Sequence, residues 1–346
     1  MVCTNVFLGV FMSLKRIAEM VGTSPSTVSR VLNNSYSTCA SADLKDRIWE
    51  AAHEIGYVPN ASARRLKLGG TDEKRSLRIG VVFGRVNDIQ SDPFFSELHR
   101  SLEADMLHRG LVLHQVVAAD QALGESLRES DGIVMAGRCS NEVLQSLRES
   151  TPNLVGIWRN PMNCEVDEVV CDGRKAAKLA MSHLIERGHR RIGYIGDCSG
   201  ESRYIGYMEA MMERQIPLDY DLVAATDQTQ ESGREAMAAI IGNESASAVL
   251  CANDATALGA LRALREAKGL GARKIAVISI DDIEEAARTA PALTTVHIPR
   301  DDMAHLALGI LQDRIAGGHV EKLRVEFPCR LVDRDSCPSF HAAGLP

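Results

Sequence analysis

The stretch LKRIAEMVGTSPSTVSRVLNN, residues 14–34, decides the fold of the first part of the chain. Its first apolar residues recur at the spacing of one helix face; they are Leu14, Ile17, Ala18 and Val21. Gly22 follows them, where a helix commonly ends. Thr23 or Ser24 offers a cap for a second helix. Pro25 suits the first position of that helix, because the N–H of a first helical residue has no acceptor within the helix and proline lacks this N–H. The stretch therefore predicts two short helices joined by a tight turn.

The second helix has one apolar and one polar face. Val28, Val31 and Leu32 fall on the apolar face, whereas short hydroxyls, an amide and a guanidinium occupy the rest. Such groups suit a helix that lies in the major groove of DNA and contacts base edges and phosphates. A third helix is expected from about residue 42 to 55, again from apolar residues at helical spacing. The three helices together predict a helix-turn-helix headpiece.

Charge is distributed unevenly along the 346 residues, whose net charge is −7. Residues 13–70 hold eight basic and five acidic residues, so this segment is basic and the remainder is acidic. Such a division indicates that only the small segment meets a polyanion. The nine cysteines form no CxxC pair, so we expect reduced thiols and no zinc ribbon. The apolar run at 6–12 is too short to span a membrane and follows no basic residue, which favours a soluble, unexported chain.

From residue 77 onward, strand-like apolar runs alternate with amphipathic helical stretches. The expected strands are 78–83, 111–117, 132–136, 154–158, 191–195, 248–251 and 274–280. The expected helices are 94–108, 142–148, 174–187, 203–214, 232–241, 255–267 and 302–315. This alternation favours parallel sheets covered by helices on both faces. Because about 260 residues exceed one such unit, we expect two α/β subdomains.

The headpiece resembles that of the LacI family of bacterial transcription regulators. The resemblance is carried by IAEMVGTSPSTVSRVLN at 17–33 and by GYVPN at 56–60, which continues into ASARRL. It implies a helix-turn-helix DNA-binding domain at 12–59, preceded by an extension at 1–11 to which we assign no role. In this family the second helix reads base edges. Pro25 and Ser26 would then set the sequence preference, and Arg30 would contact a base or a phosphate.

Residues 60–70 resemble the hinge helix and linker of the same family, although a passive linker is the alternative interpretation. The family's hinge helix pairs with its copy in the minor groove and wedges a leucine between base pairs, a role that would fall to Ala63 and Leu66. Because two hinge helices must meet, the resemblance implies a homodimer on approximately palindromic double-stranded operator DNA. The implied DNA contacts are Thr23, Pro25, Ser26, Thr27, Ser29, Arg30, Asn33, Tyr57, Asn60, Ala63 and Leu66.

The resemblance implies a periplasmic-binding-protein-like core with an effector cleft between its subdomains. The expected ranges are 77–335 for the core, with 77–172 and 300–317 in the first subdomain, 173–298 and 320–335 in the second, and a tail at 336–346. The implied effector contacts are Phe95, Trp158, Arg203, Asn253 and Asp281. They follow expected strands or begin expected helices, and ligand sites of open parallel sheets lie at the carboxyl ends of strands.

The residue types at these positions suit a hydroxylated ligand. A guanidinium, an amide and a carboxylate supply the donors and acceptors that a vicinal diol needs. Asn253 has a second interpretation as the cap of the following helix, and both roles can coexist. One of Phe94 and Phe95 is expected to be ordinary core.

Departures from the family bear on the effector. Ile298 stands where lactose-repressor-like members carry a glutamine, and the run Ile157-Trp158-Arg159 replaces a frequent carboxylate. The short segment at 120–130, DPFF at 92–95 and LTTVHIPRDDM at 293–303 look most like the branch of the evolved β-galactosidase repressor, whose members respond to galactosides. We therefore expect a small-molecule effector that is a sugar, with a galactoside favoured and Trp158 as a stacking face.

Other classes of function receive less support. The loops GxGxxG, GxxxxGK[ST] and GxSxG and the motif HExxH do not occur, and the adjacent acids at 281–282 and 301–302 are typical of a loop carboxylate beside a helix cap. We expect no enzyme, no cofactor and no metal site. A sugar transport protein would share the core but not the headpiece. A regulator that answers to a non-sugar corepressor and a sugar sensor that binds no DNA remain open beside the favoured cytoplasmic, allosteric repressor.

Overall fold

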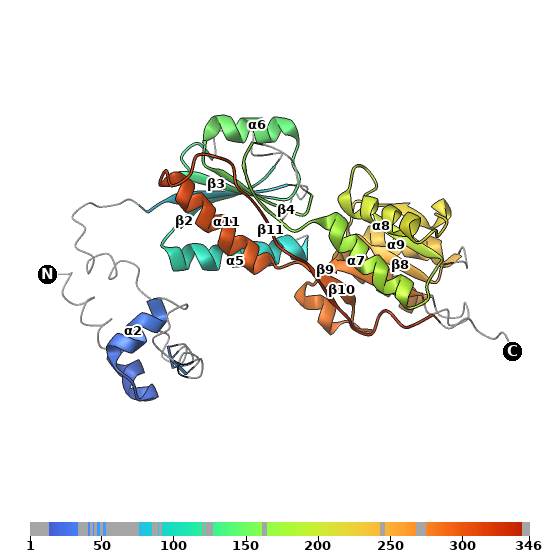
Figure 1. Cartoon of the computed structure of the whole chain (residues 1–346), viewed down its shortest axis with the longest axis horizontal. Coiled ribbons are helices and arrows are strands. Elements are labelled where there is room, and N and C mark those ends of the chain that lie inside the picture. Colours follow the sequence, from blue (N-terminus) through green and yellow to red (C-terminus); the bar gives the residue numbers. More distant parts are fainter. Residues whose placement is uncertain are drawn as a thin grey trace. The chain divides into compact units, whose positions relative to one another are not determined.

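The computed structural model (Figure 1) describes residues 14–33, 41, 44, 47–48, 51–52, 76–84, 89, 92–119, 121, 127–160, 165–242, 246–267 and 275–340. Contacts between Cα atoms divide the chain into two compact units. The first contains residues 1–76 and 107–110, and the second contains 77–106 and 111–346. The second unit contains the core expected at 77–335 except for residues 107–110.

The described part of the headpiece begins with helical residues 14–21 and a turn at Gly22, whose φ of 70° suits a residue without Cβ. The Thr23 N–H closes this turn on the Ala18 carbonyl at 2.9 Å. Helix α2 (Pro25–Asn33) follows, and its Thr27 N–H donates to Ser24 Oγ at 3.1 Å. Of the two expected capping residues, Ser24 is the one that caps the second helix.

A small apolar cluster holds the headpiece together. Its buried members are Ile17, Ala18, Val21, Val28, Val31, Leu32, Ile48, Ala51 and Ala52. Residues 44, 47–48 and 51–52 are helical, at positions where the third helix is expected. Every second-helix residue assigned to the apolar face is therefore buried. Tyr57, Asn60, Ala63 and Leu66 lie outside the described residues.

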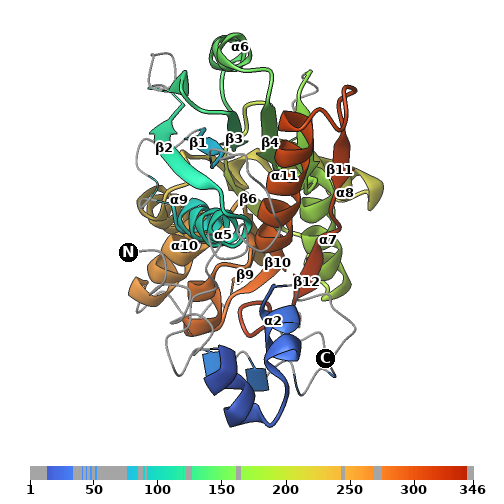
Figure 2. The ribbon, with the colours of Figure 1, turned by 90° about the vertical axis from the view of Figure 1, so that its left-hand side faces the viewer.

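The core unit contains two parallel sheets, as expected, and each sheet with its helices is called a lobe. The first lobe contains strands β1 (Arg78–Phe83), β2 (Val112–Ala118), β3 (Gly132–Ala136), β4 (Leu154–Trp158), β5 (Asp167–Val170) and β11 (Arg324–Glu326). Their order is β11-β5-β4-β3-β1-β2, and Figure 2 shows β2, β1, β3 and β4 in succession across the sheet. Helices α5 (Pro93–Arg109) and α11 (Arg300–Ile315) pack on one face and α6 (Asn141–Ser150) on the other.

The second lobe repeats this design with a different helix pairing. Its strands are β6 (Ile192–Gly196), β7 (Val223–Ala225), β8 (Ala248–Cys251), β9 (Ala276–Asp281), β10 (Thr294–His297) and β12 (Arg330–Val332), in the order β12-β10-β9-β8-β6-β7. Its helices are α7 (Gly173–Glu186), α8 (Ser202–Glu213), α9 (Gln230–Gly242) and α10 (Asp254–Glu266). Helix α7 packs beside α8, and α9 packs beside α10. Among the described strands, only β12 runs antiparallel to its neighbour, β10.

The chain passes between the lobes three times, from β5 to α7, from β10 to α11, and from β11 to β12. The last passage corrects one expected boundary. Residues 320–335 were expected in the second subdomain, but β11 pairs with β5 in the first sheet. The strand β11 has three residues and no apolar run that would predict it from the sequence. It forms because β5 would otherwise be the edge strand of the sheet, with backbone groups available for pairing.

Tight packing between α9 and α10 depends on a glycine. A Cβ at position 259 would lie 1.8 Å from the carbonyl oxygen of Gln230 and 2.8 Å from the backbone nitrogen of Arg234. Because these atoms belong to the backbone, the two helices would have to move apart.

We predict that Gly259→Ala lowers the free energy of unfolding of the full chain by about 1–3 kcal/mol, measured by urea denaturation. Gly242→Ala is the matched control, because no atom lies within 4 Å of the Cβ it would add. The control should change stability by less than about 0.5 kcal/mol. Equal effects of both substitutions would show that the close approach of the helices is not the reason for the glycine.

Candidate functional site

A cavity opens between the two lobes, at the carboxyl ends of the strands. Its cavity volume is about 30 Å³, within about 470 Å³ of space not filled by atoms that includes open solvent. Its described lining comes from both lobes and consists of Phe94, Phe95, Gly137, Arg138, Ile157, Trp158, Arg159, Asn160, Glu201, Arg203 and Met303. The residues after β3 and β4 contribute one wall, and the first turn of α8 contributes another. This is the place where open parallel sheets bind their ligands.

Local structure fixes the two phenylalanines at the start of α5. Asp92 Oδ1 accepts the Phe94 N–H at 3.0 Å, which caps the helix and places both rings in its first turn. The ring of Phe95 lies close to Gly137, where a Cβ would come within 2.8 Å of the ring. Gly137 also has a φ of 82°. Glycine at this position therefore permits the turn after β3 and the close packing of the ring.

Arg203 lies in the wall, but each of its three side-chain nitrogens already donates a hydrogen bond. Its Nε donates to Glu201 Oε1 at 2.8 Å, one terminal nitrogen donates to the Ala252 carbonyl at 2.7 Å, and the other donates to Gln228 Oε1 at 3.0 Å. The residue is 2% exposed. The sequence predicts that this guanidinium grips the effector; in the structure it holds the second lobe's loops together at the cavity wall.

The Glu201 carboxylate supplies the counter-charge for the buried guanidinium of Arg203. Burial opposes ionisation of its carboxyl, but the adjacent Arg203 outweighs burial and holds its pKa at about 2. The same carboxylate accepts the backbone N–H of Arg203 and the side-chain amide of Asn160. It therefore caps α8, neutralises a buried cation and connects to the segment after β4.

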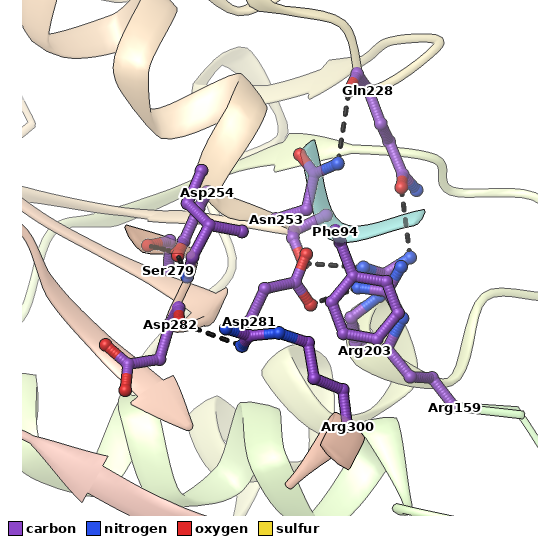
Figure 3. Close-up of polar contacts among 12 residues, drawn as sticks. Phe94, Arg159, Arg203, Gln228, Asn253, Asp254, Ser279, Asp281, Asp282 and Arg300 are labelled. Atoms are coloured by element: carbon purple, nitrogen blue, oxygen red, sulfur yellow. Dashed lines mark hydrogen bonds and ion pairs between the residues drawn. The ribbon is translucent and has the colours of Figure 1, made fainter. Parts of the chain in front are cut away.

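An ion pair between Arg159 and Asp281 crosses from the first lobe to the second. Both residues are buried, and the Arg159 guanidinium carbon also lies 4.2 Å from the centre of the Phe94 ring. Burial raises the pKa of Asp281, and Arg159 and Arg203 act in the opposite direction. Figure 3 shows Asp281 directed toward these arginines, with the Phe94 ring beside them. The pair joins the ends of β4 and β9 across the cleft.

Backbone geometry explains why two adjacent aspartates face different partners. Asp281 and Asp282 have φ angles of 139° and 56°, and such positions cost about 1–3 kcal/mol each for residues with a Cβ. Asp282 points away from the arginine pair (Figure 3) and accepts hydrogen bonds from His297 at 2.9 Å and Arg334 at 2.6 Å. Burial opposes its ionisation, but these partners hold its pKa at about 2. The strained turn thus directs the Asp281 carboxylate to the first lobe and the Asp282 carboxylate to partners within the second lobe.

A second contact joins the lobes at Glu97 of α5. Its carboxylate accepts the backbone N–H of Glu284 at 3.0 Å and pairs with Arg300 at 2.6 Å. Arg300 also donates to the Asp282 carbonyl at 3.1 Å. Burial raises the pKa of Glu97, which its partners partly offset. The start of α11, where the chain returns to the first lobe, is therefore fixed to both lobes.

Asn253 acts as a helix cap in this structure. Its Oδ1 accepts the Thr256 N–H at 3.0 Å, and its amide donates to the Gln228 carbonyl at 3.2 Å. The side chain is buried and is not among the lining residues. The next residue, Asp254, accepts hydroxyl hydrogen bonds from Ser279 and Thr295, and burial raises its pKa to about 7. These two residues organise the start of α10 behind the cavity.

Phe95 and Trp158 both contribute to the lining, but neither ring lies open to it. Phe95 is 3% exposed and packs edge-to-face against Phe83 and Phe94. Trp158 is 1% exposed, and its indole turns back over Gly156 into the apolar cluster beneath α6. Both aromatic residues are thus part of the core as well as of the wall.

Three charged lining residues did not enter the predicted site: Arg138, Arg159 and Glu201. Arg138 and Arg159 directly follow or nearly follow strands that the sequence does predict, so their position was the available signal. The sequence does not single out Glu201, apart from its position two residues before Arg203. Among the described residues, no group of three histidine, cysteine, aspartate or glutamate side chains is arranged to hold a metal ion. In the same part of the chain no helix is long and apolar enough to cross a bilayer.

The headpiece presents the other candidate surface. On α2, Pro25, Ser26 and Arg30 are exposed, while Thr27 and Ser29 are half-buried. Thr23 is half-buried in the preceding turn. For Asn33 the structure describes only its place at the end of α2. The polar groups predicted to contact DNA thus lie opposite the buried face that holds the helix in place.

Two sequence patterns match the chain. The pattern of the bacterial regulatory proteins of the lacI family matches residues 13–60, and that of the periplasmic binding protein-like domain matches residues 181–337. The chain is 30% identical over 339 residues to the HTH-type transcriptional repressor PurR of Photorhabdus laumondii. That alignment covers 94% of this chain and 96% of the relative.

Solved structures show the same architecture. The complex of the transcriptional regulator CelR with cellobiose is 26% identical, with a TM-score of 0.67, over 93% of this chain and 99% of that one. A LacI family regulator from Enterococcus faecium with bound ribose is 25% identical, with a TM-score of 0.68, over 76% of this chain and 100% of that one. The two-unit fold expected from the sequence is thereby confirmed.

The buried Glu201–Arg203 pair makes stability depend on pH. Because the pKa of Glu201 lies near 2 in the folded chain and near 4.5 when the chain is unfolded, its contribution is present above pH 4.5 and is lost as the pH falls toward 2. We predict that Glu201→Gln lowers the free energy of unfolding at neutral pH by roughly 3–5 kcal/mol, since it leaves Arg203 buried without a counter-charge.

The difference between wild type and Glu201→Gln should narrow as the pH falls below 4.5, measured by urea denaturation at a series of pH values. Glu231→Gln on α9 is the control, because its pair with Arg234 is exposed to solvent. A difference that stays constant through this pH range would contradict the assignment of the low pKa to Glu201.

Proposed function

The chain belongs to the LacI family of bacterial regulatory proteins, and we propose that it represses transcription as a homodimer on palindromic operator DNA, under the control of a sugar bound between the lobes. The observation that carries this proposal is the pairing, in one chain, of an exposed polar recognition helix with a two-lobed core that encloses a cavity. DNA-binding repression is the activity of its relatives, and cytoplasmic action follows from the location of the operator.

The recognition surface is proposed to be the exposed face of α2. Ser26 and Arg30 are exposed there, and Pro25 opens the helix beside them. A helix held by a buried apolar face can present such groups to base edges, while flanking hydroxyls and backbone groups contact phosphates. The remaining proposed contacts are Thr23, Thr27, Ser29 and Asn33, with Tyr57, Asn60, Ala63 and Leu66 beyond the described residues.

The proposed effector is a small molecule in the cavity, and bound cellobiose and ribose in two similar regulators favour a sugar. A galactoside is the specific candidate from the sequence. Phe95, Trp158, Arg203, Asn253 and Asp281 stay in the proposal as residues that form or support the wall. Because Arg159 and Asp281 belong to different lobes, a ligand that alters this pair changes the angle between the lobes.

A change of lobe angle is the proposed signal to the DNA-binding unit. The first lobe begins directly after the headpiece and its linker, so movement of this lobe repositions the paired headpieces of a dimer. Two distinct sites coupled through two states of the protein define allostery, with a typical coupling of about 1–3 kcal/mol. An inducer would favour the state with weak operator binding, whereas a corepressor would favour the state with strong binding.

We predict that Arg30→Ala weakens binding to the operator by about 1–3 kcal/mol if Arg30 reads a base, which is roughly 5-fold to 150-fold. The measurement is fluorescence anisotropy of the full chain on labelled DNA from upstream of its gene. Arg262→Ala on α10 is the control, because Arg262 is an exposed arginine of the core and should leave binding unchanged.

The same titration with and without galactosides, other sugars and purines tests the effector. Weaker binding with one sugar would support an inducible repressor, and stronger binding would indicate a corepressor. Operator binding that no compound alters would refute control by these effector classes. Absence of specific binding to any palindromic fragment would refute the repressor itself.

A further inference from the structure

The cavity has few polar groups that are free to bind a ligand. Within the described lining, each of the three nitrogens of Arg203 donates one hydrogen bond, to Glu201, the Ala252 carbonyl or Gln228, and Arg159 is paired with Asp281. Most of the groups that would be expected to hold a neutral sugar therefore hold each other. The question is which lining groups retain hydrogen-bonding capacity.

Arg138 is the lining arginine to which the described chain supplies ion-pair partners but no hydrogen-bonded acceptor. It follows Gly137 directly after β3, and its side chain is 42% exposed. The nearest described carboxylates, those of Asp197 and Glu201, lie 3.8 and 4.0 Å from one of its terminal nitrogens. These distances are too long for hydrogen bonds, so within the described chain the five N–H donors of this guanidinium have no hydrogen-bonded acceptor.

Arg138 is also placed to reach a ligand. It contributes to the cavity wall together with Arg203 and Asn160. A guanidinium presents a planar fork that matches a carboxylate or a phosphate through two parallel hydrogen bonds. Glu201 and Asp197 lie near this fork as longer ion-pair partners, and Glu201 already accepts hydrogen bonds from Arg203 and Asn160. A hydrogen-bonded partner for the fork can therefore come from a ligand.

The rest of the wall defines the remainder of the ligand. The Oδ1 atom of Asn160 is buried and has no hydrogen-bond partner, so it can accept a ligand hydroxyl. The other described walls are largely apolar and are formed by Phe94, Phe95, Ile157 and Met303. These surfaces suit the carbon-rich face of a sugar ring. One acidic group, at least one hydroxyl and one apolar face together describe a sugar that carries a negative charge.

We propose that the effector is an anionic sugar, a sugar acid or a sugar phosphate, whose charged group binds Arg138. This inference rests on the proposed function for the existence of a sugar effector, but it replaces a neutral galactoside by an acidic compound. Arg138 sets the preference for charge, and the Asn160 amide oxygen accepts a hydroxyl. Because the anion becomes the hydrogen-bonded partner of Arg138, it competes with the longer ion pairs that Arg138 makes with Asp197 and Glu201 of the second lobe.

The test is isothermal titration calorimetry of the full chain with matched pairs of compounds. The acids are galacturonate, glucuronate and gluconate, the phosphates are galactose 6-phosphate and glucose 6-phosphate, and the neutral compounds are galactose, glucose and methyl galactoside. We expect at least one anionic compound to bind tenfold or more tightly than its neutral counterpart. Its binding should weaken as sodium chloride is raised, because the contact is ionic.

Arg138→Gln should abolish this preference for charge while thermal unfolding stays unchanged, because the side chain is half exposed. Arg148→Gln on α6 is the control, since it removes an exposed arginine of the same lobe far from the lining residues. The relative affinities of the sugar acids and the sugar phosphates identify which kind of anionic group Arg138 binds.

Neutral sugars that bind as tightly as their anionic counterparts would overturn the inference, as would a preference for anions that survives in Arg138→Gln. Failure of every compound to bind would overturn it together with the sugar effector. Operator binding is measured separately, so loss of operator binding with an intact Arg138-dependent preference would refute the repressor and leave this inference standing.

Discussion

The ion pair between Arg159 and Asp281 is the contact on which the arrangement of the core depends. It joins the ends of two strands that belong to different sheets, and both side chains are buried. Removing two charges from water costs several kcal/mol, so such a pair adds little net stability while it stays intact. Separating it, however, leaves each charge buried without its partner. The lobes are therefore held at one angle by the penalty for parting these two groups.

A second pair, Glu201 with Arg203, is confined to the second lobe and has a different consequence. The Glu201 carboxylate caps the first turn of α8. It also accepts a hydrogen bond from the Arg203 guanidinium, which would otherwise face the cavity. The second lobe thus presents a rigid wall, and the first lobe contributes the more exposed Arg138. In the proposed function, a ligand that contacts both walls acts on the angle between them and so links recognition in the cleft to movement of the lobe that follows the headpiece.

The secondary structure of the core was predictable wherever apolar periodicity was strong. The expected strands at 78–83, 132–136, 154–158 and 248–251 match β1, β3, β4 and β8 residue for residue. The strands β5, β7, β10, β11 and β12 were missed, because they have three or four residues each and several carry charged or polar side chains. Short strands of this kind are specified by the partners that they join, which a single sequence does not show.

The candidate site was predictable in position but not in contacts. Arg203, Asn253 and Asp281 do lie at the carboxyl ends of strands, as expected. Their side chains, however, are engaged with Glu201, with the start of α10 and with Arg159. Sequence patterns indicate which chemical groups gather at a sheet edge, but pairing among them depends on long-range geometry. Asn253 illustrates this dependence on geometry. Its side chain caps α10 in the structure, and the ligand contact expected from the sequence would use the same side chain.

The central claim is that Arg159 and Asp281 couple the two lobes, and a double-mutant cycle tests it most directly. The free energies of unfolding of wild type, Arg159→Met, Asp281→Asn and the double variant give the coupling energy of the pair. We predict a coupling of at least about 1 kcal/mol, with the double variant less destabilised than the sum of the single variants. Additive effects within about 0.3 kcal/mol would show that the two residues act independently and that this pair does not hold the lobes together.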